Sequence, residues 1–376
     1  MIARLAAFVI FAALVTAAAP AAAAPAAAAP AAAPGTVVNS GQLPRAEWIP
    51  GTADATTVTY WSKGPAGQPM LSTGAVYVPE GTAPAGGWPV VSWAHGTVGV
   101  GDQCAPSVTG RSQRDLTYLS HWLRQGYAMV ATDYVGLGTP GVHPYLDGTS
   151  EAYSVIDMVR AARTLDPDLA RKWVVIGQSQ GGQAAMFTAH IATSYAPDLD
   201  FRGSVGTGVA SELEKLLPFA GPYVPPVPLD GTTVFAAFAL AGLRASEPDL
   251  HIDSYLTPFG VNIIDRIENL CYDEAFELAK GVGIGQLMAK PLLDPPVVAA
   301  IRRMQEVPTS GYDRPIFIGQ GIADVVVPAP LTAKLVTDLA LNRVAFVFRP
   351  YPRGHDQTMA DSLPDTTPFV KQLFAG

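Results

Sequence analysis

The feature that most constrains this chain is a strand-like run that ends in a glycine-flanked serine and continues as a helix. Residues 174–176 are Val-Val-Ile, an apolar β-branched run typical of a buried strand, and Gly177-Gln178-Ser179-Gln180-Gly181 follows at once. Residues 184–190 predict a helix. Ser179 is therefore expected in a tight strand-to-helix turn, where small neighbours let strand and helix pass closely and leave the hydroxyl accessible. The other interpretation is a glycine-rich turn in which Ser179 only caps the helix.

Strand-like and helix-like segments alternate along most of the chain. Alternating apolar and polar residues predict antiparallel edge strands at 56–60 and 74–78, and apolar runs predict further strands at 89–94, 128–132, 202–209, 316–319 and 345–349. The residue spacing predicts helices at 116–124, 151–164, 331–341 and 368–374. This alternation is typical of an α/β fold with a mostly parallel sheet and helices on both faces.

The alternation stops between residues 211 and 309. That stretch contains proline-rich apolar residues at 217–229 and helical patterns at 233–244 and 263–280. We therefore expect a core built from residues 37–210 and 310–376, with residues 211–309 inserted as a helical cap near the carboxyl edge of the sheet. The apolar runs of this cap would pack on the core, line a pocket or contact a lipid surface.

The first residues have the three-part pattern of a secretory signal. Arg4 is followed by an apolar run over residues 5–15 and then by Ala-x-Ala repeats. The run is shorter than the roughly 20 residues that a membrane-spanning helix needs. Residues 1–24 are expected to form a signal peptide and residues 25–36 a disordered Ala/Pro leader, so the mature protein is predicted to be secreted.

Composition and motif searches exclude several classes of partner. The formal net charge is −8 and no Lys/Arg cluster occurs, which argues against nucleic-acid binding. No His-Glu-x-x-His or Cys/His cluster calls for a metal. The glycine runs at 99–101 and 281–285 lack the dinucleotide-binding spacing, so no cofactor is expected.

A serine nucleophile needs a base and an acid, and in this strand-turn-helix arrangement they follow in the order acid, then histidine. Asp324 follows the predicted strand 316–319 by a glycine-containing loop, whereas Asp313 precedes that strand and would lie at the wrong end of the sheet. His355 is the only histidine after this acid, in a loop beyond the strand 345–349. Asp356 adjoins His355 and would be poorly placed to reach its Nδ1. The sequence therefore predicts Ser179, Asp324 and His355 as a triad; the alternatives are an ordinary surface carboxylate for Asp324 and an ordinary surface histidine for His355.

The developing alkoxide of such a reaction needs backbone N–H donors. One comes from the residue after the nucleophile, Gln180, and another from the loop after an earlier strand, which here is His95-Gly96-Thr97. Gly96 or Thr97 could donate, while His95 is expected to be structural.

The two cysteines, Cys104 and Cys271, are an even count in a chain predicted to reach an oxidising compartment. This favours one disulfide. The alternative is a pair of buried thiols.

Several of these segments together resemble the secretory lipase family of α/β-hydrolases, from about residue 45 to the C terminus. The motifs that carry the resemblance are residues 177–182, 93–97, 104–107, 133–134 with 136–138, and 321–324. The resemblance implies an α/β-hydrolase fold with a helical cap, a triad at Ser179, Asp324 and His355, and a disulfide that joins Cys104 to Cys271 in the cap. The chain departs from the fungal pattern in the oxyanion loop, where His95-Gly96-Thr97 replaces a segment with an acidic residue.

The expected activity is that of a secreted serine carboxylic-ester hydrolase, a lipase or esterase that works through an acyl-enzyme. Its substrates are expected to be triglycerides or other lipid esters, with contact to a lipid-water interface through the cap and a monomeric state. Three alternatives remain: an acyltransferase of the same fold, a short-chain or polyester esterase, and a non-catalytic binding protein.

Overall fold

The computed structural model describes residues 33–225 and 231–376. The predicted signal peptide, residues 1–24, and most of the predicted leader lie outside the described residues. The last residues of the predicted leader already pair with another part of the chain. The N–H of Gly35 donates to the carbonyl of Trp61, and the N–H of Trp61 donates to the carbonyl of Thr36. Among the described residues, no helix is long and apolar enough to cross a membrane.

The core is a nine-stranded sheet in the order β1-β2-β3-β5-β4-β6-β7-β8-β9. The first three strands and β5 pair antiparallel, and the pairs from β5 through β4 and on to β9 are parallel. The strands are β1 (Val37–Gln42), β2 (Thr52–Lys63), β3 (Pro69–Pro79), β4 (Trp88–Ala94), β5 (Ala128–Val135), β6 (Leu169–Gln178), β7 (Asp200–Thr207), β8 (Ile316–Gly321) and β9 (Phe346–Tyr351). The predicted mostly parallel sheet with an antiparallel edge is confirmed.

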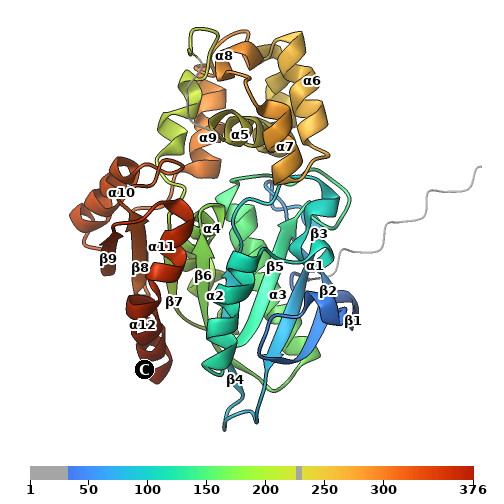
Figure 1. Cartoon of the computed structure of the whole chain (residues 1–376), viewed down its shortest axis with the longest axis vertical. Coiled ribbons are helices and arrows are strands. Elements are labelled where there is room, and N and C mark those ends of the chain that lie inside the picture. The colour runs from blue at the N-terminus through green and yellow to red at the C-terminus, as the bar shows by residue number, and fades with distance from the viewer. Residues whose placement is uncertain (1–32, 226–230) are drawn as a thin grey trace, which may run out of the picture. The chain divides into compact units, whose positions relative to one another are not determined.

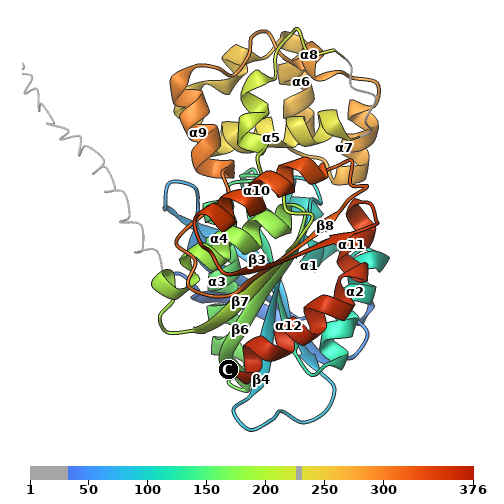
Figure 2. The same cartoon turned by 90° about the vertical axis from the view of Figure 1, so that its left-hand side faces the viewer.

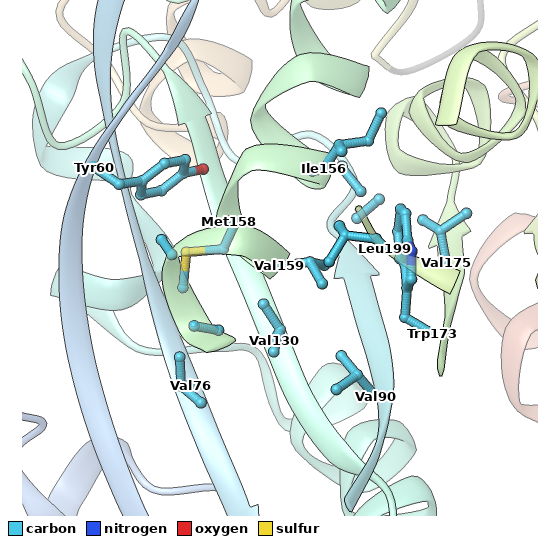
Figure 3. Close-up of a cluster of buried hydrophobic side chains, with 14 of the residues drawn as sticks. Tyr60, Val76, Val90, Val130, Ile156, Met158, Val159, Trp173, Val175 and Leu199 are labelled. Carbon is cyan, nitrogen blue, oxygen red and sulfur yellow. The ribbon is translucent and has the colours of Figure 1, made fainter. Parts of the chain in front are cut away.

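The central strands are apolar because both of their faces are covered. In β6, Trp173 and Val175 join a cluster on one face, while Val174 and Ile176 join a cluster on the other. Figure 3 shows the first cluster, in which side chains of the sheet meet Ile156, Met158 and Val159 of a long helix. Because both faces of such a strand contact apolar side chains, its residues do not alternate between polar and apolar, which explains the continuous Val-Val-Ile run.

Helices cover both faces of the sheet, as Figure 2 shows. The face of Figure 3 carries α3 (Gly148–Leu165) and α4 (Gln180–Tyr195), and α10 (Ala329–Leu341) packs beside α4 on β8. The other face carries α2 (Gln113–Arg124) and α12 (Leu363–Ala375), with Trp93 of β4 against Tyr118 of α2 and Phe317 of β8 against Phe369 of α12. Two shorter helices, α1 (Pro106–Thr109) and α11 (His355–Asp361), lie in the loops after β4 and β9.

The chain between β7 and β8 forms a separate layer of helices at one end of the sheet (Figure 1). Its helices are α5 (Thr232–Ser246), α6 (Pro258–Ile267), α7 (Tyr272–Ala279), α8 (Ile284–Leu287) and α9 (Pro295–Gln305), with 3₁₀ turns at Leu213–Lys215, Leu217–Phe219, Pro248–Leu250 and Ile252–Tyr255. None of its described residues belongs to a strand of the sheet. We refer to residues 211–309 as the helical insertion.

The helical insertion has its own apolar core, which continues into loops of the sheet. Phe238 and Leu240 of α5 are fully buried there, and the ring of Phe238 lies 5.7 Å from that of Tyr145 in the loop after β5. The same cluster includes Val100 after β4 and Val327 after β8. The apolar residues of α5 therefore pack the helical insertion onto the loops at the sheet edge.

A disulfide between Cys104 and Cys271 joins the loop after β4 to the N terminus of α7, which confirms the predicted bridge. Their Cα atoms lie 5.3 Å apart. The backbone reinforces this junction, because the N–H of Tyr272 donates to the carbonyl of Val98.

Candidate active site

Ser179 lies between the last residue of β6 and the first residue of α4. Its backbone has φ 61° and ψ −121°, a conformation that a non-glycine residue adopts only when the surrounding structure holds it there. A side chain at Gly177 would collide with the carbonyl of Gly181, and one at Gly181 would collide with the carbonyl of Ala94. Both glycines are therefore required by the close crossing of β4, β6 and α4. The serine is partly exposed, as a nucleophile must be.

Asp324 and His355 form a direct pair. His355 Nδ1 lies 2.7 Å from Asp324 Oδ2, and the aspartate side chain is fully buried. The other carboxylate oxygen accepts the backbone N–H groups of Val326 and Val327, at 2.9 and 2.8 Å. Gln320 Nε2 adds a bond of 3.2 Å to Oδ2. These donors fix the position of the carboxylate, and Oδ2 faces the imidazole that it orients.

The loops that carry this pair are tied to each other and to the serine. The N–H of Ala323 donates to the carbonyl of Arg353, which joins the loop of Asp324 to the residues just before His355. Gly208 lies between the pair and the serine: a side chain there would come within 2.9 Å of His355 Cε1, and the preceding carbonyl, of Thr207, accepts the N–H of Ser179. His355 Nε2 is buried and has no hydrogen-bond partner among the described residues. It is the atom that a nucleophile's proton would reach.

One detail of the prediction for the histidine is wrong. His355 is the first residue of α11 and does not lie in a loop, because the chain turns into a helix directly after Gly354. The rejected acids lie elsewhere: Asp356 is bound by Arg114, and Asp313 accepts a hydrogen bond from Thr193 at the opposite end of β8.

The loop after β4 runs directly beside the serine. A side chain at Gly96 would lie 3.6 Å from the Cβ of Ser179, which places the backbone of residues 96–97 next to the nucleophile. His95 is buried with Nδ1 at 2.7 Å from the carbonyl of Gly96 and Nε2 at 3.3 Å from that of Asp133, and burial lowers the pKa of its imidazole. Its ring holds the loop's shape and does not face the pair of Asp324 and His355. Thr97 Oγ1 lies 2.6 Å from the hydroxyl of Tyr145.

Gln180, the residue after the serine, begins α4, so its backbone N–H belongs to the first turn of a helix, where N–H groups have no intrahelical acceptor. Its side chain is buried and its Nε2 lies 2.8 Å from both Glu151 Oε1 and His143 Nε2. Neither partner was predicted from the sequence. A buried glutamate in the first turn of a helix gives no local signal, and its partners stand 8 and 29 residues away along the chain.

Chemically, this arrangement offers a hydroxyl on a strained turn, an acid-bound imidazole with a free Nε2, and a helix N terminus beside a glycine loop. Such a set suits proton removal from the hydroxyl and stabilisation of a negative oxygen. Among the described residues, no group of three or more His, Cys, Asp or Glu side chains could hold a metal ion.

The chain is similar in sequence to proteins named as lipases. The model of the "Secretory lipase" family matches residues 103–347. Lipase A of Moesziomyces aphidis is 24% identical over 372 residues, covering 92% of this chain and 77% of that protein. A Mycobacterium tuberculosis protein named "Probable inactive lipase" is 26% identical over 317 residues, covering 78% of this chain and 68% of its own.

Solved structures share the fold. Candida antarctica lipase A in its closed state superposes with a TM-score of 0.76 at 22% identity, over 92% of this chain and 83% of that one. A rice cell wall degrading esterase from Xanthomonas oryzae superposes with a TM-score of 0.72 at 19% identity, over 92% of this chain and 99% of that one. These likenesses confirm the predicted α/β-hydrolase fold.

Proposed function

The chain belongs to the secretory lipase family and is thus a hydrolase of the lipase and esterase class, and we propose that it cleaves carboxylic esters through a Ser-His-Asp triad of Ser179, His355 and Asp324. The observation that carries the proposal is the bond of 2.7 Å between His355 Nδ1 and Asp324 Oδ2, in two segments that lie next to the strained turn of Ser179.

The reaction follows from these roles. Nε2 of His355 accepts the hydroxyl proton of Ser179 as the oxygen attacks the ester carbonyl, and Asp324 stabilises the imidazolium that forms. The backbone N–H of Gln180, with that of Gly96 or Thr97, donates to the negative oxygen of the tetrahedral intermediate. His355 then gives its proton to the departing alcohol, and a water molecule releases the acyl group from Ser179 by the same steps in reverse.

The test is hydrolysis of p-nitrophenyl butyrate by the secreted protein and by Ser179→Ala. We expect the wild type to turn over the ester and the variant to lose at least about 10³-fold in kcat while it keeps its circular dichroism spectrum and Tm. Activity that survives in Ser179→Ala would sink the assignment of the nucleophile. The test matters because one relative bears the name of an inactive lipase.

We further propose that the substrates are lipid esters and that the helical insertion contacts the lipid surface. Three large apolar side chains of the helical insertion are more than half exposed, namely Leu216 at 55%, Phe219 at 58% and Tyr223 at 60%. They lie within residues 216–223, in the segment of the helical insertion that follows β7, the strand whose Thr207 carbonyl accepts the N–H of Ser179. Exposed side chains of this size are typical of a contact surface when they occur close together.

The proposed lipid contact is tested by comparing activity on an emulsified ester with activity on a dissolved ester. The triple variant Leu216→Ser, Phe219→Ser, Tyr223→Ser should lose about 10-fold or more in activity on emulsified triglyceride, because it buries less apolar area at the droplet. Its kcat/KM on dissolved p-nitrophenyl butyrate should stay within about twofold. A matched control is Val38→Ser with Val108→Ser, which removes exposed apolar side chains from β1 and α1. An equal loss on both substrate forms would refute the lipid contact.

A further inference from the structure

Behind the nucleophile lies a group of three fully buried polar side chains that the proposed reaction does not use directly. Glu151 of α3, His143 of the loop after β5 and the side chain of Gln180 converge, with Gln180 Nε2 at 2.8 Å from each of the other two. His143 Nδ1 lies 2.9 Å from the carbonyl of Val135 and donates to it, which leaves Nε2 as an acceptor. The two hydrogens of the Gln180 amide therefore have one acceptor each.

Glu151 is itself anchored by the backbone. Its Oε1 also accepts the N–H of Leu146 at 3.1 Å, and Glu151 is in the first turn of α3, whose N-cap is Asp147. The hydrogen bonds of the group thus run from the amide of Gln180 to α3 and to the loop that joins β5 to α3.

The loop that joins β5 to α3 also contacts Thr97, a candidate for the second backbone donor to the oxyanion. Tyr145 stands two residues after His143, and its hydroxyl lies 2.6 Å from Thr97 Oγ1. Tyr145 is buried and packs on Phe238 of the helical insertion. Residues 143–151 therefore contact the side chains of Gln180 and Thr97, two of the three residues whose backbones are candidates to bind the oxyanion.

Burial disfavours the charged forms of both ionisable side chains in this group. Burial raises the pKa of Glu151 well above its usual value, and burial lowers the pKa of His143 to about 3. Its acidic neighbour is Asp147, and the other titratable groups near it are Tyr134, Tyr145 and, beside His143, His95.

We propose that Glu151 and His143 are positioning residues for the oxyanion hole: they fix the side chain of Gln180, and through it the direction of the Gln180 backbone N–H. The proposal rests on the proposed function. The N–H of Gln180 has no intrahelical acceptor, and its peptide is held on the other side, where the carbonyl of Ser179 accepts the N–H groups of Gln183 and Ala210. The buried side chain of Gln180 adds an anchor on the far side of the same residue. A donor turned away from the oxyanion loses much of its effect, because hydrogen bonds weaken steeply with angle and distance.

The test uses three variants and one control. Glu151→Gln keeps an oxygen acceptor at the position of Oε1, Glu151→Leu removes it, and Gln180→Ala keeps the peptide N–H but removes the anchored side chain. Asp157→Leu is the matched control, since it removes another fully buried carboxylate from α3, one that is bound to Ser62, Tyr195 and Arg160, away from Ser179.

Two readouts separate positioning from mere stability. The first is kcat and KM on p-nitrophenyl butyrate at a temperature well below the Tm of each variant. The second is the ratio of kcat/KM for this ester to that for its thiono analogue, in which sulfur replaces the carbonyl oxygen. Sulfur accepts hydrogen bonds weakly, so an intact oxyanion hole favours the oxygen ester and a damaged one discriminates less.

We expect Glu151→Leu and Gln180→Ala to lose about 10- to 100-fold in kcat with KM within about twofold, below the cost of deleting a donor outright. Their preference for oxygen over sulfur should fall, and Glu151→Gln and Asp157→Leu should keep both values within about threefold of wild type. The proposal is overturned if Gln180→Ala, or a folded Glu151→Leu, keeps the wild-type kcat and preference. It is also overturned if Asp157→Leu loses both to the same extent. A wild-type protein without esterase activity, or a Ser179→Ala variant that retains it, would instead refute the proposed function.

Discussion

Asp324 accepts two backbone N–H groups on one oxygen and the imidazole of His355 on the other, so its role depends on the second oxygen alone. Asp324→Asn would place an amide opposite His355 Nδ1 and favour the wrong tautomer of the ring. We expect kcat on p-nitrophenyl butyrate to fall by about 10⁴-fold, the size of the corresponding loss in serine proteases. The measurement is a progress curve with active-site titration of the variant.

Asp356 supplies the control for this prediction, because it adjoins His355 in sequence and pairs with Arg114. Asp356→Asn should keep kcat within about threefold, since exposed ion pairs contribute little. A larger loss in Asp356→Asn than in Asp324→Asn would show that the acid has been assigned to the wrong residue.

At the residue scale, the candidate triad could be read from the sequence, and its surroundings could not. Ser179 has a local pattern, and Asp324 and His355 each follow a recognisable apolar strand. Glu151, His143 and Gln180 meet only because α3 and the loop before it pack against the first turn of α4. No periodicity or motif records a contact of that kind, because it depends on tertiary packing.

At the scale of elements, the disulfide links the loop after β4 to α7 across a sequence separation of 167 residues. In the chain-entropy model a loop of this length contributes about 5 kcal/mol to the free energy of unfolding. We expect the double variant Cys104→Ala, Cys271→Ala to unfold at a Tm lowered by several degrees, and titration of the denatured, unreduced wild type to find no free thiol.

The single variants provide the control for this prediction. Cys104→Ala and Cys271→Ala should each expose one titratable thiol and share the low Tm of the double variant. Two free thiols in the wild type, or a wild-type Tm that is indifferent to reductant, would contradict the bridge.

The elements that the sequence analysis missed share a physical cause. β1 has the sequence Val-Val-Asn-Ser-Gly-Gln and lies at the edge of the sheet with most of its residues exposed, so burial imposes no pattern on it. The predicted strands at 56–60 and 74–78 cover only the middle of β2 and the second half of β3, which extend over 12 and 11 residues. The remaining residues of β2 and β3 are strand because the two strands pair with each other. The composition of one segment does not reveal its pairing partner.

At the scale of the whole molecule, stability should depend on pH through two buried carboxyls of α3 and its cap. Burial raises the pKa of Asp147 and of Asp157 from 3.8 to about 6. The folded protein therefore binds protons more tightly than the unfolded chain. The resulting stabilisation is complete below about pH 4 and is lost as the pH rises through about 6, with at most about 3 kcal/mol from each group.

Urea unfolding of wild type and Asp157→Asn between pH 4 and 7 measures this effect. The asparagine variant cannot titrate, so we expect its free energy of unfolding to fall less than that of the wild type over this range. The exposed Asp249→Asn should follow the wild-type curve. Parallel curves for wild type and Asp157→Asn would contradict the prediction.

The sequence also predicted that the helices between the two parts of the core form an insertion, because strand-helix alternation stops there. It did not reveal that this insertion shares one apolar core with the loops around the candidate site, including Val100, Tyr145 and Val327. Such continuity follows from three-dimensional packing of loops far apart in the chain. It also means that substitutions in α5 can reach the site through Tyr145.

The central claim is that Ser179 is a nucleophile activated by His355 and Asp324, and the most direct measurement is covalent labelling by a fluorophosphonate. We expect one phosphonyl group to add per chain and peptide mapping to place it on Ser179. Asp324→Asn should slow the labelling rate strongly, and folded Ser179→Ala should take up no label. Absence of labelling in folded wild-type protein, or a label on another residue, would contradict the account.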